Sequence, residues 1–210
     1  MPKITNPLYR EFLDKGIIKI LSYDQLKAAL DNVTGINGQY VKEGRAFLIT
    51  LYYTGARPCE VLNLTAKGIL HQDTYITMEL QAAKHGLNRT IYIPDHYAAI
   101  KELWDYATRQ YPDMYLFYHY RSNSTKTVKK KNGTTKAYAV ISDKARYHVG
   151  RWFPGLTPYF MRHSRFSQLS EAGLTPEELR QIKGAKTLGS VLPYLHLSSR
   201  TARKIAKSIR

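Results

Sequence analysis

The stretch LYYTGARPCEVLNL, residues 51–64, predicts two helices separated by a sharp break. Apolar side chains recur at helical spacing through and before it: Phe47, Leu48, Leu51 and Tyr52. This pattern is typical of a mostly buried helix, which we expect to cover residues 43–54. Gly55 ends that helix, and Pro58 suits the first turn of a second helix that runs to Leu64. Arg57 lies at the break, where an arginine can point its planar set of N–H donors into a cleft.

The rest of the chain predicts a mostly helical α+β domain with a small antiparallel sheet. Two strands are expected at residues 75–80 and 90–93, joined by a polar turn. Residues 121–138 are polar and basic, and they are expected to form a loop or a hairpin with a tight turn at Asn132-Gly133. Further helices are expected to begin near residues that can cap them: Asp24, Asp95, Thr157 and Thr175.

The charge of the chain predicts a polyanionic partner. The formal net charge is +16, from 32 Lys and Arg against 16 Asp and Glu. Cations that neutralise phosphates release counterions, so nucleic acid is the first expectation and an anionic membrane surface the second. A basic protein without such a partner is the remaining alternative.

The single cysteine, Cys59, excludes an internal disulfide framework and a cysteine-based zinc site. The sequence contains no apolar stretch near the ~20 residues of a membrane span, and its first ten residues have no apolar signal core. We therefore expect a cytoplasmic, DNA-associated protein with no membrane partner.

Breaking a phosphodiester without a metal requires a nucleophile, cations for the non-bridging oxygens and an acid for the leaving oxygen. The sequence has no HExxH, CxxC or trusted paired-carboxylate pattern, so no metal site and no cofactor are expected. Its Gly-rich run at residues 184–189 does not match a Walker motif. A tyrosine nucleophile with arginine clamps is the chemistry that remains.

Four features lie in order along residues 24–197: the stretch 51–64, Lys84 in the turn between the expected strands, the stretch 157–167, and the spacing from Gly184 to Tyr194. Together they resemble the catalytic domain of the tyrosine recombinases, the phage integrase family. Residues 51–64 resemble the first signature box, and residues 157–167 (TPYFMRHSRFS) resemble the HxxRH helix. Gly184 is followed ten residues later by Tyr194, a spacing similar to that of the third box. Lys84, in the turn between the two expected strands, resembles the hairpin lysine of the family.

The resemblance implies a site-specific recombinase that cuts and rejoins DNA through a 3′-phosphotyrosyl intermediate. Tyr194 would be the nucleophile, and Arg57 and Arg162 would grip the scissile phosphate. Lys84 would protonate the leaving 5′ oxygen, and Glu60 would orient Arg57.

The chain departs from the family pattern at two positions. Tyr159 stands where the HxxRH motif usually has its first histidine, a form similar to one group of archaeal plasmid and virus integrases. Tyrosine can donate a hydrogen bond to a phosphate oxygen but is a poor general base near neutral pH. Ala185 stands where a histidine or tryptophan is usual, and Lys186 is the nearest substitute. His163, next to Arg162, is expected to pack or to support the site.

Double-stranded DNA and further copies of the chain are the expected partners, since the resemblance implies a tetramer on paired duplexes. DNA contacts are expected from five side chains: Lys126, Lys129, Lys130, Lys131 and Arg165. The expected organisation is a lead-in segment at residues 1–22, the catalytic domain at 23–198 and a basic amphipathic helix at 199–210. That last helix either docks on a neighbouring subunit or packs on its own domain.

Two other functions fit the same residues. The substitutions at Tyr159 and Ala185 leave open a non-catalytic DNA-binding protein on the same fold. A type IB topoisomerase-like enzyme would use similar chemistry to relax DNA without pairing two sites.

Overall fold

Helix α3 (Val41–Thr54) runs through the centre of the fold. In this computed structural model, residues 20–34, 40–83, 86–129, 133, 135–141, 143–154 and 156–195 are described. Every side chain from Ala46 to Thr54 is buried, which confirms the expected buried helix. Gly55 follows in the left-handed conformation, with a φ of 56°, and turns the chain toward α4 (Pro58–Val61). The second helix is thus shorter than the expected run to Leu64.

The N-terminal helix α2 (Tyr23–Asp31) packs Leu26, Ala29 and Leu30 into the core beside α3. Its cap is Ser22, which forms a reciprocal capping box with Gln25. The expectation that Asp24 caps this helix is wrong, since Asp24 lies in the first turn.

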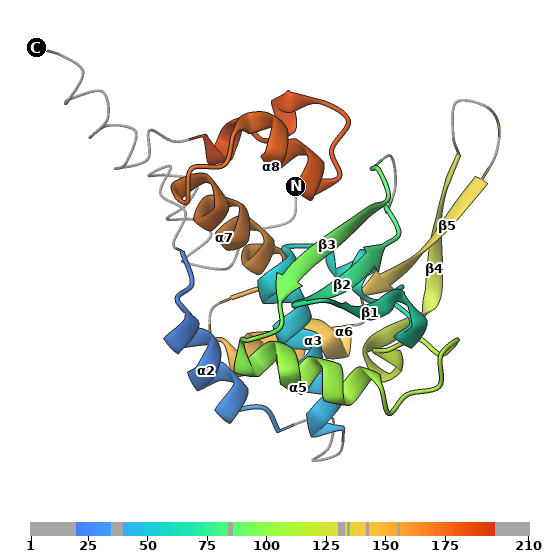
Figure 1. The fold of residues 1–210 in the computed structure, drawn as a ribbon. Helices are drawn as coiled ribbons and strands as arrows, with labels where there is room; N and C mark the ends of the chain where they lie inside the picture. The colour runs from blue at the N-terminus through green and yellow to red at the C-terminus, as the bar shows by residue number, and fades with distance from the viewer. Residues whose placement is uncertain are drawn as a thin grey trace, which may run out of the picture.

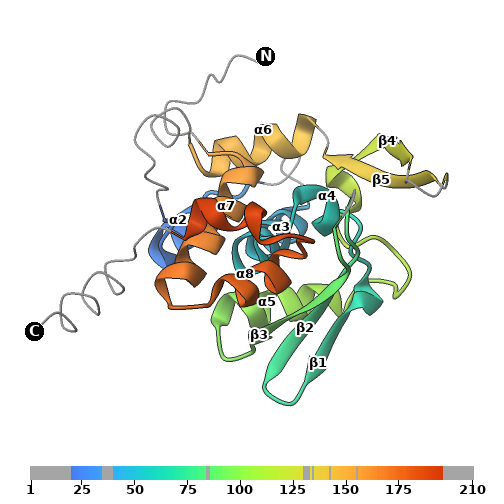
Figure 2. The same cartoon turned by 90° about the horizontal axis from the view of Figure 1, so that it is seen from above.

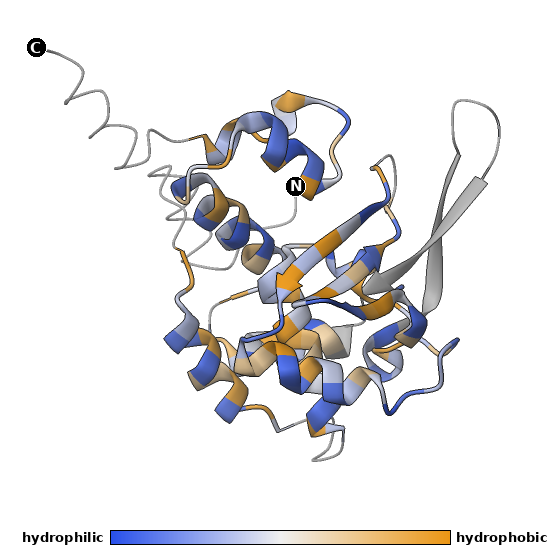
Figure 3. Ribbon diagram, in the orientation of Figure 1, coloured by the Kyte–Doolittle hydropathy of each residue, from blue (hydrophilic) through white to orange (hydrophobic). Residues whose placement is uncertain are grey.

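A three-stranded antiparallel sheet lies against this helical core, in the order β1 (Ile69–Gln72), β2 (Tyr75–Leu80) and β3 (Arg89–Pro94). The two expected strands, β2 and β3, are confirmed, and they pair with Met78 opposite Ile91. Alternating apolar and polar residues appear as bands along β3 in Figure 3. The apolar face joins the same core as α3 and α5. Strand β1 was not expected, because only its first residue is buried and it shows no alternation.

Helix α5 (Ala98–Ala107) follows the sheet and begins after Tyr97, two residues later than the cap expected at Asp95. Asp95 instead pairs with His71 of β1 at 2.8 Å. The acidic side chain therefore ties the end of β3 to the opposite edge strand rather than to a helix.

The basic segment after α5 forms a hairpin, not an open loop, from β4 (Arg121–Lys129) and β5 (Thr135–Ile141). Figures 1 and 2 both show this hairpin extending away from the three-stranded sheet. Gly133 at its tip has a φ of 81°, and Asn132 lies outside the described residues. Helix α6 (Asp143–Trp152) follows, and its bounds were not predicted from the sequence.

The C-terminal part contains α7 (Pro158–Glu171) and α8 (Pro176–Lys183), followed by two single turns at Leu188–Ser190 and Leu192–Tyr194. The expected caps are confirmed, because the side-chain hydroxyls of Thr157 and Thr175 each accept a hydrogen bond from a backbone N–H of the first turn. A second small core joins these elements through four buried side chains: Phe166, Leu179, Val191 and Tyr194.

These elements confirm a mostly helical α+β domain with a small antiparallel sheet. The lead-in segment up to residue 19 and the C-terminal helix expected at 199–210 lie outside the described residues. Within the described part, none of the helices has the length and apolar character needed to cross a membrane.

Gly44 of α3 tests how tightly the core is packed. A Cβ there would lie 2.7 Å from the Tyr120 hydroxyl and 2.9 Å from the Trp152 ring. Alanine favours a helix over glycine by about 1 kcal/mol, yet overpacking costs about 1–3 kcal/mol. We expect Gly44→Ala to lower the free energy of unfolding measured by urea denaturation.

The matched control is Gly189→Ala, because a Cβ at Gly189 would meet nothing within 4 Å. We expect little change in the control. A G44A protein as stable as the control would show that this part of the core is not tightly packed.

Candidate active site

The carboxylate of Glu60, on α4, is fully buried and joins several parts of the fold. Its Oε1 accepts from Arg57 Nη1 at 2.8 Å and from the Ala83 backbone N–H at 3.3 Å. Its Oε2 accepts from Arg89 Nη2 at 2.8 Å and from the Arg57 backbone N–H at 2.9 Å. Arg162 Nη1 lies 4.0 Å from the same carboxylate.

Burial alone would raise the pKa of Glu60. The guanidinium groups of Arg89, Arg162 and Arg57 outweigh burial and lower that pKa to about 2. Glu60 is therefore ionised at neutral pH, and its charge holds three arginines from α4, β3 and α7 around one point.

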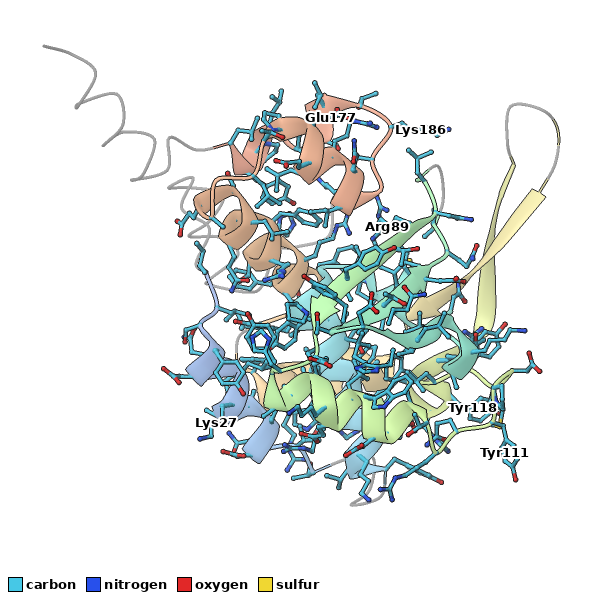
Figure 4. All side chains as sticks on the ribbon, in the orientation of Figure 1. Lys27, Arg89, Tyr111, Tyr118, Glu177 and Lys186 are labelled. Atoms are coloured by element: carbon cyan, nitrogen blue, oxygen red, sulfur yellow. The ribbon has the colours of Figure 1, made fainter. Side chains whose placement is uncertain are left out.

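Arg89 was given no role by the sequence, yet its side chain is 7% exposed and central to the site. Besides Glu60, it donates from Nε to the Ile182 carbonyl at 2.7 Å. Gly184, which ends α8 with a φ of 64°, lets Arg89 approach, because a Cβ there would lie 2.7 Å from Arg89 Nη1. Figure 4 shows Arg89 between β3 and the end of α8. Arg89 thus connects the sheet to the C-terminal helices.

Arg162 is buried one turn into α7, where the cap at Thr157 and Pro158 set the start of the helix. It donates from Nη1 to the Gly55 carbonyl at 2.7 Å and from Nη2 to the Lys183 carbonyl at 3.1 Å. Burial, followed by repulsion from Arg57, lowers its pKa to about 10. Arg162 stays charged near neutral pH, although its surroundings already contain excess positive charge.

Tyr194, the expected nucleophile, is buried in the second core at 3% exposure. Its ring packs on Phe166, with the centroids 5.5 Å apart. Its hydroxyl lies 2.9 Å from His163 Nδ1. The phenol is also close enough to Arg162 to interact with it electrostatically. The structure therefore brings Arg57, Arg162 and Tyr194 into one region.

Tyr159 lies in the first turn of α7 and is 46% exposed. Partial burial, with a contribution from Cys59, raises the pKa of its phenol, and the cations Arg57 and Arg162 oppose this rise. The hydroxyl therefore keeps its proton near neutral pH and can act as a hydrogen-bond donor beside both arginines.

Lys183 is a buried cation that the sequence analysis missed. Its Nζ donates to the Ser190 carbonyl and lies 4.5 Å from the centroid of the Tyr194 ring. Burial and the nearby Arg162 and Arg57 lower its pKa to about 8. Lys186, expected to replace the donor missing at Ala185, is exposed on the loop after α8 (Figure 4).

Lys84 lies outside the described residues, but the residue before it, Ala83, is bonded to Glu60. Among the expected DNA contacts, Lys126 and Lys129 are on β4, whereas Lys130 and Lys131 are outside the described part of the chain.

Arg165, on α7, is half-buried, and its Nη1 lies 3.3 Å from the Gln168 side-chain oxygen. A role for Arg165 in DNA contact stays a prediction.

The site has the charge needed to bind an anion. Arg57, Arg89 and Arg162 interact with the Glu60 carboxylate, and Lys183 adds a fourth cation that interacts with Arg162 and Arg57. In the described ranges, no cluster of three or more His, Cys, Asp or Glu could hold a metal ion. The arrangement can stabilise negative charge next to a tyrosine hydroxyl.

The chain resembles known proteins in sequence. The model of the phage integrase family matches residues 19–200. Tyrosine recombinase XerA of Pyrococcus furiosus is 25% identical over 157 residues, which are 74% of this chain and 51% of that protein.

It also resembles solved structures. XerH site-specific recombinase bound to palindromic difH substrate has a TM-score of 0.63 and 17% identity, over 91% of this chain and 53% of the other. The catalytic domain of bacteriophage HP1 integrase has a TM-score of 0.51 and 19% identity, over 92% of this chain and 96% of that domain. The chain thus shares their fold and spans about half the length of XerA and XerH.

Replacing Glu60 by glutamine keeps the shape of the side chain but removes the charge that holds Arg57 and Arg89. We expect Glu60→Gln to lower the free energy of unfolding at neutral pH by about 3 kcal/mol, the scale for breaking a buried ion pair. Urea denaturation measures the loss. Glu79→Gln, which removes an exposed carboxylate from β2, is the control and should change little.

The effect of Glu60→Gln should depend on pH. The pKa of Glu60 falls on folding from its ordinary 4.5 to about 2, so its charge stabilises the fold above pH 4.5. That stability is lost as the pH falls from 4.5 toward 2, and the gap between wild type and variant should close there. A gap that persists unchanged at the acid end would contradict this assignment.

Proposed function

Since the chain belongs to the phage integrase family, we propose that it is a site-specific DNA recombinase that cleaves and rejoins strands through Tyr194. One observation supports the proposal most directly. The hydroxyl of Tyr194 lies close to the buried cations Arg162 and Lys183, in a region with more positive than negative charge. Burial, followed by repulsion from neighbouring arginines, lowers the pKa of both Arg162 and Lys183. A phosphate group would relieve that repulsion, and the additional charge of the transition state would relieve it further.

In the proposed reaction, Tyr194 Oη attacks phosphorus, and the bond from phosphorus to the 5′ oxygen breaks. Arg57 and Arg162 bind the non-bridging oxygens, and the Tyr159 hydroxyl donates a further hydrogen bond. Lys84 gives the departing 5′ oxygen its proton. A 5′ hydroxyl from a second strand then attacks phosphorus and gives its proton back to Lys84, and the bond from phosphorus to Tyr194 Oη breaks. The energy of the ester is therefore conserved without ATP.

Double-stranded DNA is the proposed partner, and the solved structure of XerH, which shares the fold, contains its palindromic difH substrate. The net charge of +16 supports this partner. The basic hairpin of β4 and β5 extends from the body and presents a second candidate surface for the DNA backbone. We further propose that four subunits pair two duplexes, with the C-terminal segment at 199–210 contacting a neighbour.

Covalent trapping tests the proposed chemistry. The protein is incubated with a pool of nicked duplexes of randomised sequence, in which loss of a short strand prevents religation. We expect a DNA adduct that survives denaturant and maps to Tyr194 by mass spectrometry. Tyr194→Phe should remove the adduct, because phenylalanine has no attacking oxygen.

Duplexes that bind without forming an adduct would favour a non-catalytic DNA-binding protein, the alternative motivated by the departures at Tyr159 and Ala185. Adducts of the wild type that lead to plasmid relaxation without strand exchange would favour a type IB topoisomerase-like enzyme.

The two proposed clamps should matter more for cleavage than for binding. Arg57→Ala and Arg162→Lys are each expected to slow adduct formation by roughly 10²-fold or more, the scale for losing one transition-state donor. Gel-shift affinity should change far less, because many other cations contact the backbone. Arg109→Ala removes an exposed charge after α5 and serves as the charge-matched control. If the gel-shift affinity fell by as large a factor as the rate of adduct formation, both arginines would only bind DNA and would not stabilise the transition state.

A further inference from the structure

The hydroxyl of Tyr194 has a defined partner in His163. Phenol oxygen and imidazole Nδ1 are 2.9 Å apart, and the two ring centroids are 5.7 Å apart. His163 lies on α7, one residue after Arg162, whereas Tyr194 lies in the single turn Leu192–Tyr194. The fold of the C-terminal elements therefore brings a potential proton acceptor to the atom that would attack phosphorus.

His163 is in the form that can accept a proton. Three described groups face it: Tyr194 from the C-terminal turn, Lys183 from α8 and Arg162 from its own helix. Burial, then the charges of Lys183 and Arg162, lower the pKa of His163 to about 4. The imidazole is thus neutral near neutral pH, and the tautomer with its proton on Nε2 has a lone pair on Nδ1.

The other candidates for this role fit less well. Tyr159 occupies the position where the family pattern has histidine, but the raised pKa of its phenol keeps it protonated. Lys183 has a lowered pKa, but its Nζ is bonded to the Ser190 carbonyl and lies 4.5 Å from the centre of the Tyr194 ring. A cation in that place favours the phenolate over the phenol without removing the proton itself.

We propose that His163 is the catalytic base that activates Tyr194, a role that rests on the proposed recombinase function. As Tyr194 Oη forms its bond to phosphorus, the phenolic proton moves to His163 Nδ1, and the electron pair of the O–H bond stays on the attacking oxygen. The bond to the 5′ oxygen breaks, and that oxygen takes its proton from Lys84. In the rejoining step Lys84 takes the proton of the attacking 5′ hydroxyl, and His163 returns its proton to the departing Tyr194 oxygen.

Binding of DNA strengthens this base. The negative charge of the scissile phosphate, placed between the arginines and the phenol, favours the imidazolium form and raises the proton affinity of His163. The base is therefore weak in the free protein and stronger in the complex, where proton transfer is needed.

His163→Asn separates proton transfer from positioning. The Oδ1 of asparagine can replace Nδ1 as a hydrogen-bond acceptor, but an amide does not take a proton near neutral pH. On duplexes selected by trapping with the wild type, we expect the variant to bind normally and to form the Tyr194 adduct roughly 10²-fold more slowly or worse. Circular dichroism and thermal denaturation establish that the variant is folded.

A more acidic phenol gives a readout that a structural role would not change. Incorporating 3,5-difluorotyrosine at position 194 lowers the phenol pKa, so the nucleophile depends less on a base. We expect the gap between wild type and His163→Asn to narrow markedly in the fluorinated proteins. Tyr159→Phe, which loses a proposed phosphate donor, should show no such rescue.

The pH profile supplies a second readout. The adduct rate of the wild type should level off once His163 is deprotonated in the complex, whereas the rate of His163→Asn should keep rising with hydroxide concentration. A folded variant that reacts at the wild-type rate, or whose deficit is the same with the fluorinated phenol, would overturn the role of His163 alone. A wild type that forms no adduct on any duplex would overturn the proposed function itself.

Discussion

The buried carboxylate of Glu60 is the interaction on which the site depends. Its two oxygens bind Arg57, Arg89 and the Ala83 backbone N–H, so one side chain joins α4, β3 and the turn that follows β2. A buried carboxylate is costly unless it is paired, and the paired arginines would in turn be costly without it. The same charge therefore holds the fold together and sets the position of Arg57.

Arg89 and Arg162 connect the Glu60 carboxylate to the C-terminal helices. Arg89 bonds to the Ile182 carbonyl, and Arg162 bonds to the Gly55 and Lys183 carbonyls. The end of α8, and with it the buried Lys183, is thereby fixed against α3 and the sheet. One carboxylate does not balance all these cations, and burial together with repulsion from neighbouring arginines lowers the pKa of both Arg162 and Lys183. A cluster of cations fixed in this way can stabilise negative charge that develops beside it without having to rearrange.

The sequence predicted those features that local patterns encode. Helix α3, strands β2 and β3, and the caps Thr157 and Thr175 follow from periodicity and capping chemistry, whereas β1, with one buried residue, has no pattern to detect. In the site, Arg57, Arg162 and Tyr194 are predicted through the resemblance to the signature boxes of the family. Arg89 and His163 depend on partners 29 and 31 residues away, which no local pattern reveals. Lys183 is the last residue of an amphipathic helix. A lysine at that position is usually exposed, and its charge interacts favourably with the helix dipole, so the sequence does not indicate a buried cation.

The central proposal is that the cations arranged around Glu60 hold one phosphate beside the Tyr194 hydroxyl. A crystal structure with vanadate and a pair of DNA fragments that abut at the cleavage site tests it most directly, because vanadate adopts the five-coordinate geometry of the transition state. We expect vanadium bonded to Tyr194 Oη, with its equatorial oxygens on Arg57 and Arg162. Vanadium bound at another residue, or a Tyr194 hydroxyl that stays remote from both guanidinium groups, would contradict the account.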